Sequence, residues 1–264
     1  MVSNVWLEGF DPSYVFKTKL DFKNWLLENM EEACLQPFIS TYDLGVLVDK
    51  TSSYGLKTLL LPVSAGQRAL EIINKKSAKI SLSSIVSFPF GNESTAAHNL
   101  QEIGELQKLG INDIGLEADL NAISKDEYSG VLKDLVESVH KAGGSLSLSI
   151  DLKSLPKDKW EKALEIVKTV KPDFVSTQVP YIDNRDGTSS DIDDGTVNDI
   201  VKFIGSKIED KQTTGIKVAG DIFEINDVVS ALFYGYNSKW PLDRIKIITS
   251  NAFEILEQLN TSDF

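Results

Sequence analysis

TTGIKVAGD, residues 213–221, places one lysine inside a segment whose apolar neighbours predict a buried β-strand that ends in a glycine turn. This residue, Lys217, needs a physical reason to be there, because an ammonium group buried without a partner is costly. Either an acid pairs with it, or its pKa falls and the amine becomes a nucleophile toward carbonyl compounds. The plainer interpretation is that Lys217 lies at the strand end and reaches solvent without a chemical role.

On both sides of this strand, short apolar segments alternate with amphipathic segments of helical periodicity. The segments expected to be strands are residues 31–37, 58–62, 79–88, 113–117, 145–150, 173–177, 215–219 and 245–249. No hairpin signal separates them, so the strands are expected to be parallel. Eight consecutive βα units in a chain of 264 residues predict a closed (β/α)8 barrel rather than an open doubly wound sheet.

An additional helix is expected before the first strand, where Phe22, Trp25 and Leu26 recur at helical spacing. We therefore expect residues 1–30 to form an N-terminal helical extension. Residues 31–264 are expected to form a single barrel domain, because barrels of roughly 250 residues are usually one unit.

Composition and charge limit the possible functions. The chain has 39 acidic and 27 basic residues and no basic run, which argues against nucleic acid as a partner. Its single cysteine, Cys34, excludes an internal disulfide and a multi-cysteine metal site. Because neither a signal peptide nor an apolar run of roughly 20 residues is found, we expect a cytoplasmic protein that does not bind membranes.

Three segments, in the right order and at the ends of expected strands, carry a resemblance to a known family. They are SIVSFPFGNESTAAHNLQEIGELQKLGINDIG (84–115), PDFVST (172–177) and GIKVAGDIFEINDVV (215–229). With them the chain resembles the deoxyribose-phosphate aldolase family from about residue 31 to residue 259. The FPFGN phrase and the G-x-K-x-A-G phrase are fairly specific together.

The resemblance implies a (β/α)8 barrel that cleaves or forms a carbon–carbon bond through a lysine Schiff base, without a metal or other cofactor. It implies a small carbonyl compound or sugar as substrate, deoxyribose 5-phosphate in the family itself. It also implies a homo-oligomer, a dimer or a tetramer.

The catalytic residues of the family are only partly kept. The family's nucleophilic lysine belongs to a K-T-S-T-G phrase that reads STQVP here, so Ser176 replaces it. The companion lysine of the next strand matches Lys217. The family's catalytic aspartate aligns with Gly115, and Glu117, on the same face of that strand, is the nearest substitute. The acid that the family carries on strand five is kept as Asp151.

The phosphate site of the family is also altered. The family binds phosphate with the backbone amides of glycine and serine after strands six, seven and eight. The matching positions here are Pro180, Gly220, Asp221, Ser250 and Asn251. Proline has no amide proton, and the carboxylate of Asp221 repels an anion, so an uncharged or amine-bearing substrate is favoured over a phosphorylated one.

Three functions remain open at this point. In the first, the chain is an aldolase-type lyase in which Lys217 itself is the nucleophile, Glu117 or Asp151 relays protons, and Ser176 and Thr177 orient a water molecule. In the second, it is a catalytically silent barrel that serves as a binding or scaffold protein, with the acidic loop 183–194 as a docking segment.

The third function is that of a metal-assisted barrel hydrolase. The dense acidic cluster that would hold the metal is Asp183, Asp186, Asp191, Asp193 and Asp194. The two histidines, His98 and His140, fall on expected helices rather than at strand ends, which is typical of surface residues and not of ligands. We therefore expect no metal site.

Overall fold

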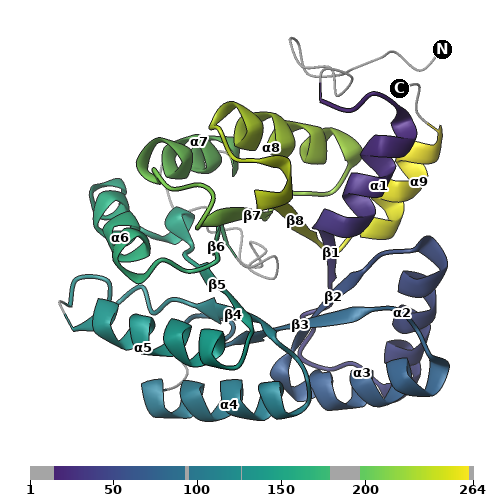
Figure 1. The fold of residues 1–264 in the computed structure, drawn as a ribbon, viewed down its shortest axis with the longest axis horizontal. Coiled ribbons are helices and arrows are strands. Elements are labelled where there is room, and N and C mark those ends of the chain that lie inside the picture. The colour runs from purple at the N-terminus through teal and green to yellow at the C-terminus, as the bar shows by residue number, and fades with distance from the viewer. Residues whose placement is uncertain (1–14, 93–94, 126, 179–196, 262–264) are drawn as a thin grey trace.

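A computed structural model of the protein describes residues 15–92, 95–125, 127–178 and 197–261. In this part of the chain, parallel strands form a closed barrel in which each strand pairs with its neighbours in chain order and β8 pairs with β1. Helices surround the barrel on the outside (Figure 1). The predicted (β/α)8 barrel is confirmed.

The strands are β1 (Met30–Ala33), β2 (Thr58–Pro62), β3 (Ser81–Val86), β4 (Asp113–Glu117), β5 (Ser145–Ser149), β6 (Phe174–Ser176), β7 (Gly215–Ala219) and β8 (Ile245–Thr249). The helices that follow them in turn are α2 (Thr41–Tyr54), α3 (Val63–Lys76), α4 (Ala96–Lys108), α5 (Tyr128–Lys141), α6 (Lys157–Val170), α7 (Val197–Lys207), α8 (Ile225–Asn237) and α9 (Ala252–Thr261). Two short 3-10 turns, η2 (Leu152–Ser154) and η3 (Leu242–Arg244), follow β5 and precede β8.

Four strands differ from their expected bounds, and two of them, β5 and β6, are only shorter by one and two residues. β1 begins one residue earlier than expected and ends at Ala33, where its pairing with β2 stops. β3 is shorter than the expected 79–88. Ser87, directly after it, has a φ of 58°, and this left-handed conformation ends the extended backbone.

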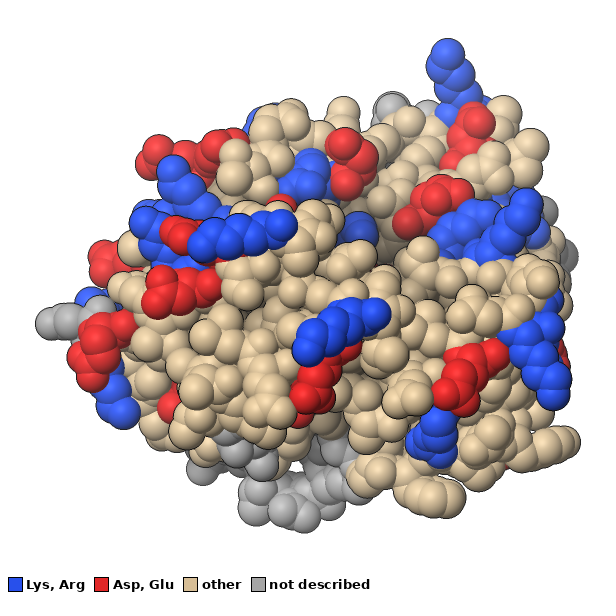
Figure 2. All heavy atoms as spheres, turned by 60° about the horizontal axis from the view of Figure 1, so that its bottom comes forward, with Lys and Arg blue, Asp and Glu red and all other residues tan. Residues whose placement is uncertain are grey.

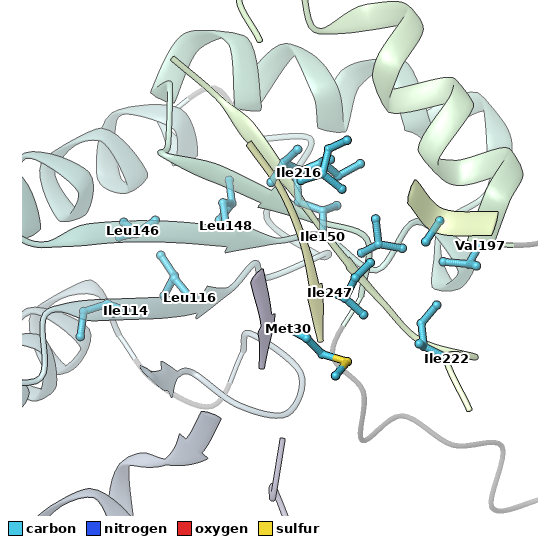
Figure 3. Packing of buried hydrophobic residues seen from close by; sticks show 14 of the residues in the cluster. Met30, Ile114, Leu116, Leu146, Leu148, Ile150, Val197, Ile216, Ile222 and Ile247 are labelled. Carbon is cyan, nitrogen blue, oxygen red and sulfur yellow. The ribbon is translucent and has the colours of Figure 1, made fainter. Parts of the chain in front are cut away.

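Side chains that alternate along the strands separate an outer apolar layer from a polar interior. On β4 and β5 the residues that face the helices are Ile114, Leu116, Leu146 and Leu148, and all are buried (Figure 3). Burying each such side chain contributes about 2 kcal/mol. The residues between them, which face the barrel axis, are serines, a glycine and acids. The core that stabilises the fold therefore lies between sheet and helices. The interior holds polar groups together with a smaller apolar cluster that includes Leu60, Ile85 and Ile248.

The extra N-terminal helix is α1 (Lys19–Asn29), capped by the side chain of Thr18, which accepts a hydrogen bond from the amide of Asp21. Phe22 is fully buried, and the indole of Trp25 donates to the carbonyl of Leu242 in η3 over 3.0 Å. Helix α1 lies beside α9 in Figure 1. The first fourteen residues of the expected extension lie outside the described part of the chain.

The surface carries charges of both signs. In Figure 2, lysine and arginine side chains lie among aspartates and glutamates, and neither sign forms a continuous patch on that face. Within the described ranges, no helix is both long enough and apolar enough to cross a membrane.

Glu32 joins β1 to the last helix. It is 5% exposed, and its Oε2 accepts a hydrogen bond of 2.9 Å from the amide of Ala252, the first residue of α9. Burial raises the pKa of Glu32 to about 7, although the hydrogen bond from Ala252 acts in the opposite direction. Folding therefore favours the protonated form of this side chain.

The raised pKa predicts that Glu32 makes stability depend on pH. Its contribution is fully present below its ordinary pKa and is lost as the pH rises through about 7. We expect Glu32→Gln, which imitates the protonated form, to be more stable than wild type at about pH 8 by up to about 3 kcal/mol and similar to it at about pH 4. Urea unfolding at both pH values measures this. Glu137→Gln, on the exposed surface of α5, is the control, and an equal gain there would contradict the assignment.

Candidate active site

Lys217 lies in the middle of β7 and reaches into the barrel, where its side chain is 2% exposed. Its ammonium nitrogen lies 2.8 Å from Oε1 of Glu31 on β1 and 3.2 Å from Oδ1 of Asp113 on β4. These strands are not neighbours of one another in the barrel, so the two ion pairs cross its interior. The lysine is buried and paired with acids.

Two opposing effects act on the pKa of Lys217. Burial, the largest single effect, lowers it, but the charges and hydrogen bonds of Asp113 and Glu31 together outweigh burial, and the pKa rises above the ordinary lysine value. Lys217 is therefore an ammonium ion at neutral pH. A free amine has to be generated before it attacks a carbonyl group.

The ammonium group points toward the amino ends of the strands. Asp113 is the first residue of β4, and the nitrogen of Lys217 also lies 5.5 Å from the ring centre of Phe174, the first residue of β6. Lys246 approaches the same ring to 5.0 Å and lies 4.0 Å from Asp113 Oδ2. Lys217 thus forms the floor of a site whose mouth is at the carboxyl ends of the strands, where barrel enzymes bind substrates.

Gly115, at which the resemblance predicts the catalytic aspartate of the family, has no room for a larger side chain without a shift. A Cβ at this position would lie 3.3 Å from Cβ and Cγ1 of Ile85 on the neighbouring strand. The acid of β4 that contacts Lys217 is Asp113, two residues earlier on the same face.

A cavity of about 20 Å³ lies next to Lys217 in the barrel interior. Its polar lining is Glu31, Ser83, Ser147, Ser149, Ser176, Gln178 and Lys217. A cavity of this size holds about one water molecule. Ser147 Oγ and Glu31 Oε2 are buried without a hydrogen-bond partner among the described residues, so both can bind a small polar group there.

Glu117 ends β4 at the carboxyl end of the barrel and is 2% exposed. Burial raises its pKa well above the ordinary value, and the charge of Asp151 acts in the same direction, whereas Ser149 opposes it. Glu117 therefore keeps its proton to a higher pH than an exposed glutamate. It does not line the cavity, and the acids that contact Lys217 are the two described above.

Asp151 caps the 3-10 turn η2. One carboxylate oxygen accepts from the amide of Lys153 over 3.1 Å, and the other accepts from the hydroxyl of Ser154 over 2.5 Å. Asp151 is 4% exposed. Its carboxylate is thus engaged by its own loop, and it acts on Glu117 through its charge.

Ser176 and Thr177 at the end of β6 have different surroundings. Ser176 pairs in register with Lys217, lines the cavity and donates its hydroxyl to the carbonyl of Gln178 over 3.0 Å. Thr177 is fully buried, and its hydroxyl both donates to the carbonyl of Ala219 and accepts from its amide. The structure brings Ser176 to the cavity and uses Thr177 to hold β6 against β7.

The remaining predicted residues lie at the carboxyl ends of β7 and β8. Gly220 and Asp221 follow β7, with φ of 89° and 53°, and Asp221 forms an ion pair with Lys153. Ser250 is exposed and Asn251 is partly buried, between β8 and α9. These residues surround the mouth and do not contribute to the lining of the central cavity.

No metal centre is found in the part of the chain that the structure describes, where no group of three or more His, Cys, Asp or Glu side chains is close enough to hold an ion. The acidic cluster between residues 183 and 194 lies outside the described residues. His98 lies 3.5 Å from Glu102 on α4, and Nε2 of His140 lies 2.8 Å from Asp173 Oδ2. Both histidines are thus on helices, where they were expected.

Sequence reasoning missed the two acids that pair with Lys217, and Lys153 at the rim. Glu31 and Asp113 stand at alternate positions of short strands, which places them on the inward face. That signal was present, but it does not reveal which inward side chains meet across the barrel. The partners follow from the registers of β1 and β4, which the sequence alone does not supply.

The buried ion pairs predict a large effect of removing the lysine. Lys217→Met leaves Glu31 buried without its cation, and we expect a loss of about 3–5 kcal/mol in the free energy of unfolding. Removing the acids as well, in Lys217→Met/Glu31→Gln/Asp113→Asn, is expected to recover most of the loss. Urea unfolding measures both variants, and a triple variant no more stable than Lys217→Met would contradict the pairing.

Gly220 provides a second prediction. A Cβ there would lie 1.7 Å from Nε2 of Gln178, and the positive φ is itself unfavourable for alanine, by about 1–2 kcal/mol. We expect Gly220→Ala to destabilise the protein. Adding Gln178→Ala to this variant is expected to remove the clash, but the unfavourable positive φ of an alanine at position 220 remains. Thermal unfolding of the two variants tests this. Equal stability of the single and the double variant would show that Gln178 does not fill this space.

Comparison with known proteins gives the same relationship from two sides. No family model matches the chain. It is 22% identical over 232 residues to the deoxyribose-phosphate aldolase of Thermococcus kodakarensis, covering 86% of this chain and 96% of the relative. It is 28% identical over 190 residues to that of Mycoplasmopsis pulmonis, covering 71% and 82%.

Solved structures show the same fold. The tetrameric deoxyribose phosphate aldolase from Aeropyrum pernix has a TM-score of 0.75 at 17% identity, covering 94% of this chain and 95% of that one. A putative deoxyribose-phosphate aldolase from Toxoplasma gondii has a TM-score of 0.75 at 16% identity, covering 93% and 99%. In sequence and in fold, this chain is thus similar to deoxyribose-phosphate aldolases.

Proposed function

We propose that the protein is an aldolase-type lyase that breaks or forms a carbon–carbon bond through a Schiff base on Lys217. The observation that carries the proposal is a lysine buried on the floor of a polar barrel interior with two carboxylates within 3.2 Å of its nitrogen. The relatives are aldolases, which supports the reaction class. In this proposal Lys217 replaces the nucleophile that the family carries at the position of Ser176.

Because the pKa of Lys217 is raised, the reaction has to begin with the removal of a proton from its ammonium group. Glu31 takes a proton from the ammonium group over 2.8 Å, and the free amine adds to the carbonyl carbon of the substrate. The resulting carbinolamine loses its hydroxyl as water, with a proton from Glu117, and a protonated imine remains. The proton transfer stays within the buried ion pair, so no bulk base is needed.

The bond cleavage then uses the imine as the electron sink. The deprotonated Glu117 accepts the proton of the substrate hydroxyl next to the bond that breaks, and an aldehyde leaves. The electron pair of the broken bond forms an enamine. Glu117 returns the proton to the enamine carbon. Water then hydrolyses the protonated imine, the proton released goes to Glu117, and Glu31 returns its proton to the amine of Lys217.

The other predicted residues support proton transfer or bind the substrate. Asp151 raises the pKa of Glu117 by its charge, and Ser176 offers a hydroxyl to water or substrate at the cavity. Thr177 holds β6 to β7 behind Ser176, and Gly220, Asp221, Ser250 and Asn251 bind the part of the substrate at the mouth. The substrate is a small carbonyl compound or sugar, and no cofactor takes part. We further propose a cytoplasmic homo-oligomer, in line with the tetramer of the Aeropyrum pernix enzyme.

A second candidate function is a catalytically silent barrel that binds a partner. It is favoured by the ion pairs that hold Lys217 charged and by a cavity that holds about one water molecule. In that case Lys217 stabilises the fold and performs no chemistry.

Borohydride trapping distinguishes the two functions. The protein is incubated with small aldehydes, ketones and sugars, reduced, and mapped by mass spectrometry of its peptides. We expect an adduct on Lys217. Lys217→Arg, which keeps the positive charge toward Glu31 and Asp113, is expected to lose it without unfolding, whereas Lys246→Ala is expected to keep it. A folded wild type without an adduct on Lys217 for any compound would overturn the aldolase proposal in favour of the silent barrel.

A further inference from the structure

The loops after β7 and β8 lead into α8 and α9, where (β/α)8 barrels frequently bind phosphate. Such a site needs backbone amides at the start of a helix that point to solvent without an acceptor. In this protein, amides at the start of both helices are already bonded to side chains of the chain itself.

At α8, the amides of Phe223 and Glu224 both donate to Oδ2 of Asp227, over 2.8 and 3.0 Å. The amide of Ile225 donates to Oε1 of Gln258 on α9 over 2.8 Å. A phosphate at this helix would have to displace a carboxylate that belongs to the first turn of the same helix. That carboxylate would then lie close to the phosphate and repel it.

At α9, the first amide, that of Ala252, donates to the buried carboxylate of Glu32 over 2.9 Å. The amide of Asn251 donates to the hydroxyl of Thr249 over 3.0 Å. Glu32 belongs to β1, which pairs with β8 directly before α9, and it is 5% exposed, so its carboxyl group is buried beneath the helix start. The second helix therefore offers a phosphate no better place than the first.

The loop between β7 and α8 is also filled. The side chain of Gln178 packs directly against Gly220, and Asp221 adds a carboxylate that is 56% exposed at the rim. The nearby cation, Lys153, forms an ion pair with Asp221. An anion that bound Lys153 would first have to separate Lys153 from Asp221. Lys153 is therefore not available as an unpaired positive charge at the rim.

We propose that the site accepts unphosphorylated carbonyl compounds, uncharged short-chain hydroxyaldehydes and ketones, and rejects their phosphate esters. This inference rests on the proposed function, since it names the substrate class of that reaction. The carboxylates of Asp227 and Glu32 engage the first amides of α8 and α9, and Asp221 adds a negative charge at the rim between them and the barrel interior.

The first test compares matched compounds in the borohydride assay. Glyceraldehyde is compared with glyceraldehyde 3-phosphate, and deoxyribose with deoxyribose 5-phosphate. We expect the adduct on Lys217 to form at least about tenfold faster with the unphosphorylated member of each pair. An equal or faster rate with the phosphate ester would overturn the inference and leave the aldolase proposal intact. No adduct in any case would overturn the aldolase proposal.

The second test does not depend on catalysis. Inorganic phosphate is titrated into the wild-type protein and followed by the shift in melting temperature, against chloride at matched ionic strength. We expect no saturable shift in wild type. Asp227→Asn and Asp221→Asn each remove a negative charge at the mouth, and the double variant is expected to show a saturable shift that wild type lacks.

The control for charge alone is Asp134→Asn, on the exposed surface of α5, which is expected to leave phosphate binding unchanged. Saturable phosphate binding by wild type, or an equal gain in the control, would overturn the assignment of these carboxylates. The shift in melting temperature is measured without forming an adduct on Lys217. The two tests therefore separate a failure of the substrate class from a failure of the reaction.

Discussion

The ion pairs of Lys217 with Glu31 and Asp113 are the interaction on which the interior of this protein depends. Lys217 and Glu31 are both 2% exposed and are stable in the barrel because they pair, since the cost of burying one charge alone is several kcal/mol. Asp113, 23% exposed at the amino end of β4, adds a second partner. The pairs join strands on different sides of the barrel, so the interior is held by charge and the outer layer by apolar packing. The serines around them keep the volume small and polar.

This arrangement also determines what chemistry is open to the site. A lysine held by two acids is a poor nucleophile until it transfers a proton, but the acids that suppress its reactivity are also bases within hydrogen-bond distance. The same contacts thus support a Schiff-base enzyme and a stable silent barrel. The two functions differ in whether a carbonyl compound binds next to Lys217, because the amine can form a Schiff base only with a bound carbonyl group.

The sequence predicted the presence and order of all eight strands, and it predicted the bounds best where the periodic signal is strong. In β4 and β5, apolar residues alternate with serines, a glycine and acids, and glycines or prolines stand near many of the ends. The place of Lys217 followed from its apolar neighbours. Its partners did not, because Glu31 and Asp113 are 186 and 104 residues away from it in the chain, and they meet it only after the barrel has closed.

The helix starts were likewise beyond the reach of sequence reasoning. Asp227 reads as an ordinary first-turn acid of α8, and nothing local shows that Glu32 lies beneath α9, 220 residues away. Asp221 was recognised as an obstacle to phosphate, but its ion pair with Lys153 depends on the shapes of two separate loops. Local sequence patterns predicted the positions of the strands and helices around this site. Its ion pairs and hydrogen bonds depend on residues that meet only after the barrel has closed.

The close contact at Gly115 and the small cavity beside Ser176 affect how this barrel would accept the aspartate and the lysine that the resembled family is expected to carry at these positions. Ile85 stands against the position that an aspartate at 115 would need, and the cavity beside Ser176 holds about one water molecule. An aspartate at position 115 would require Ile85 to move by a few tenths of an ångström, because a Cβ there would lie 3.3 Å from it. A lysine at position 176 would bring a second positive charge close to Lys217 and would fill the cavity, so the two positions differ in what the barrel would have to change to accept them.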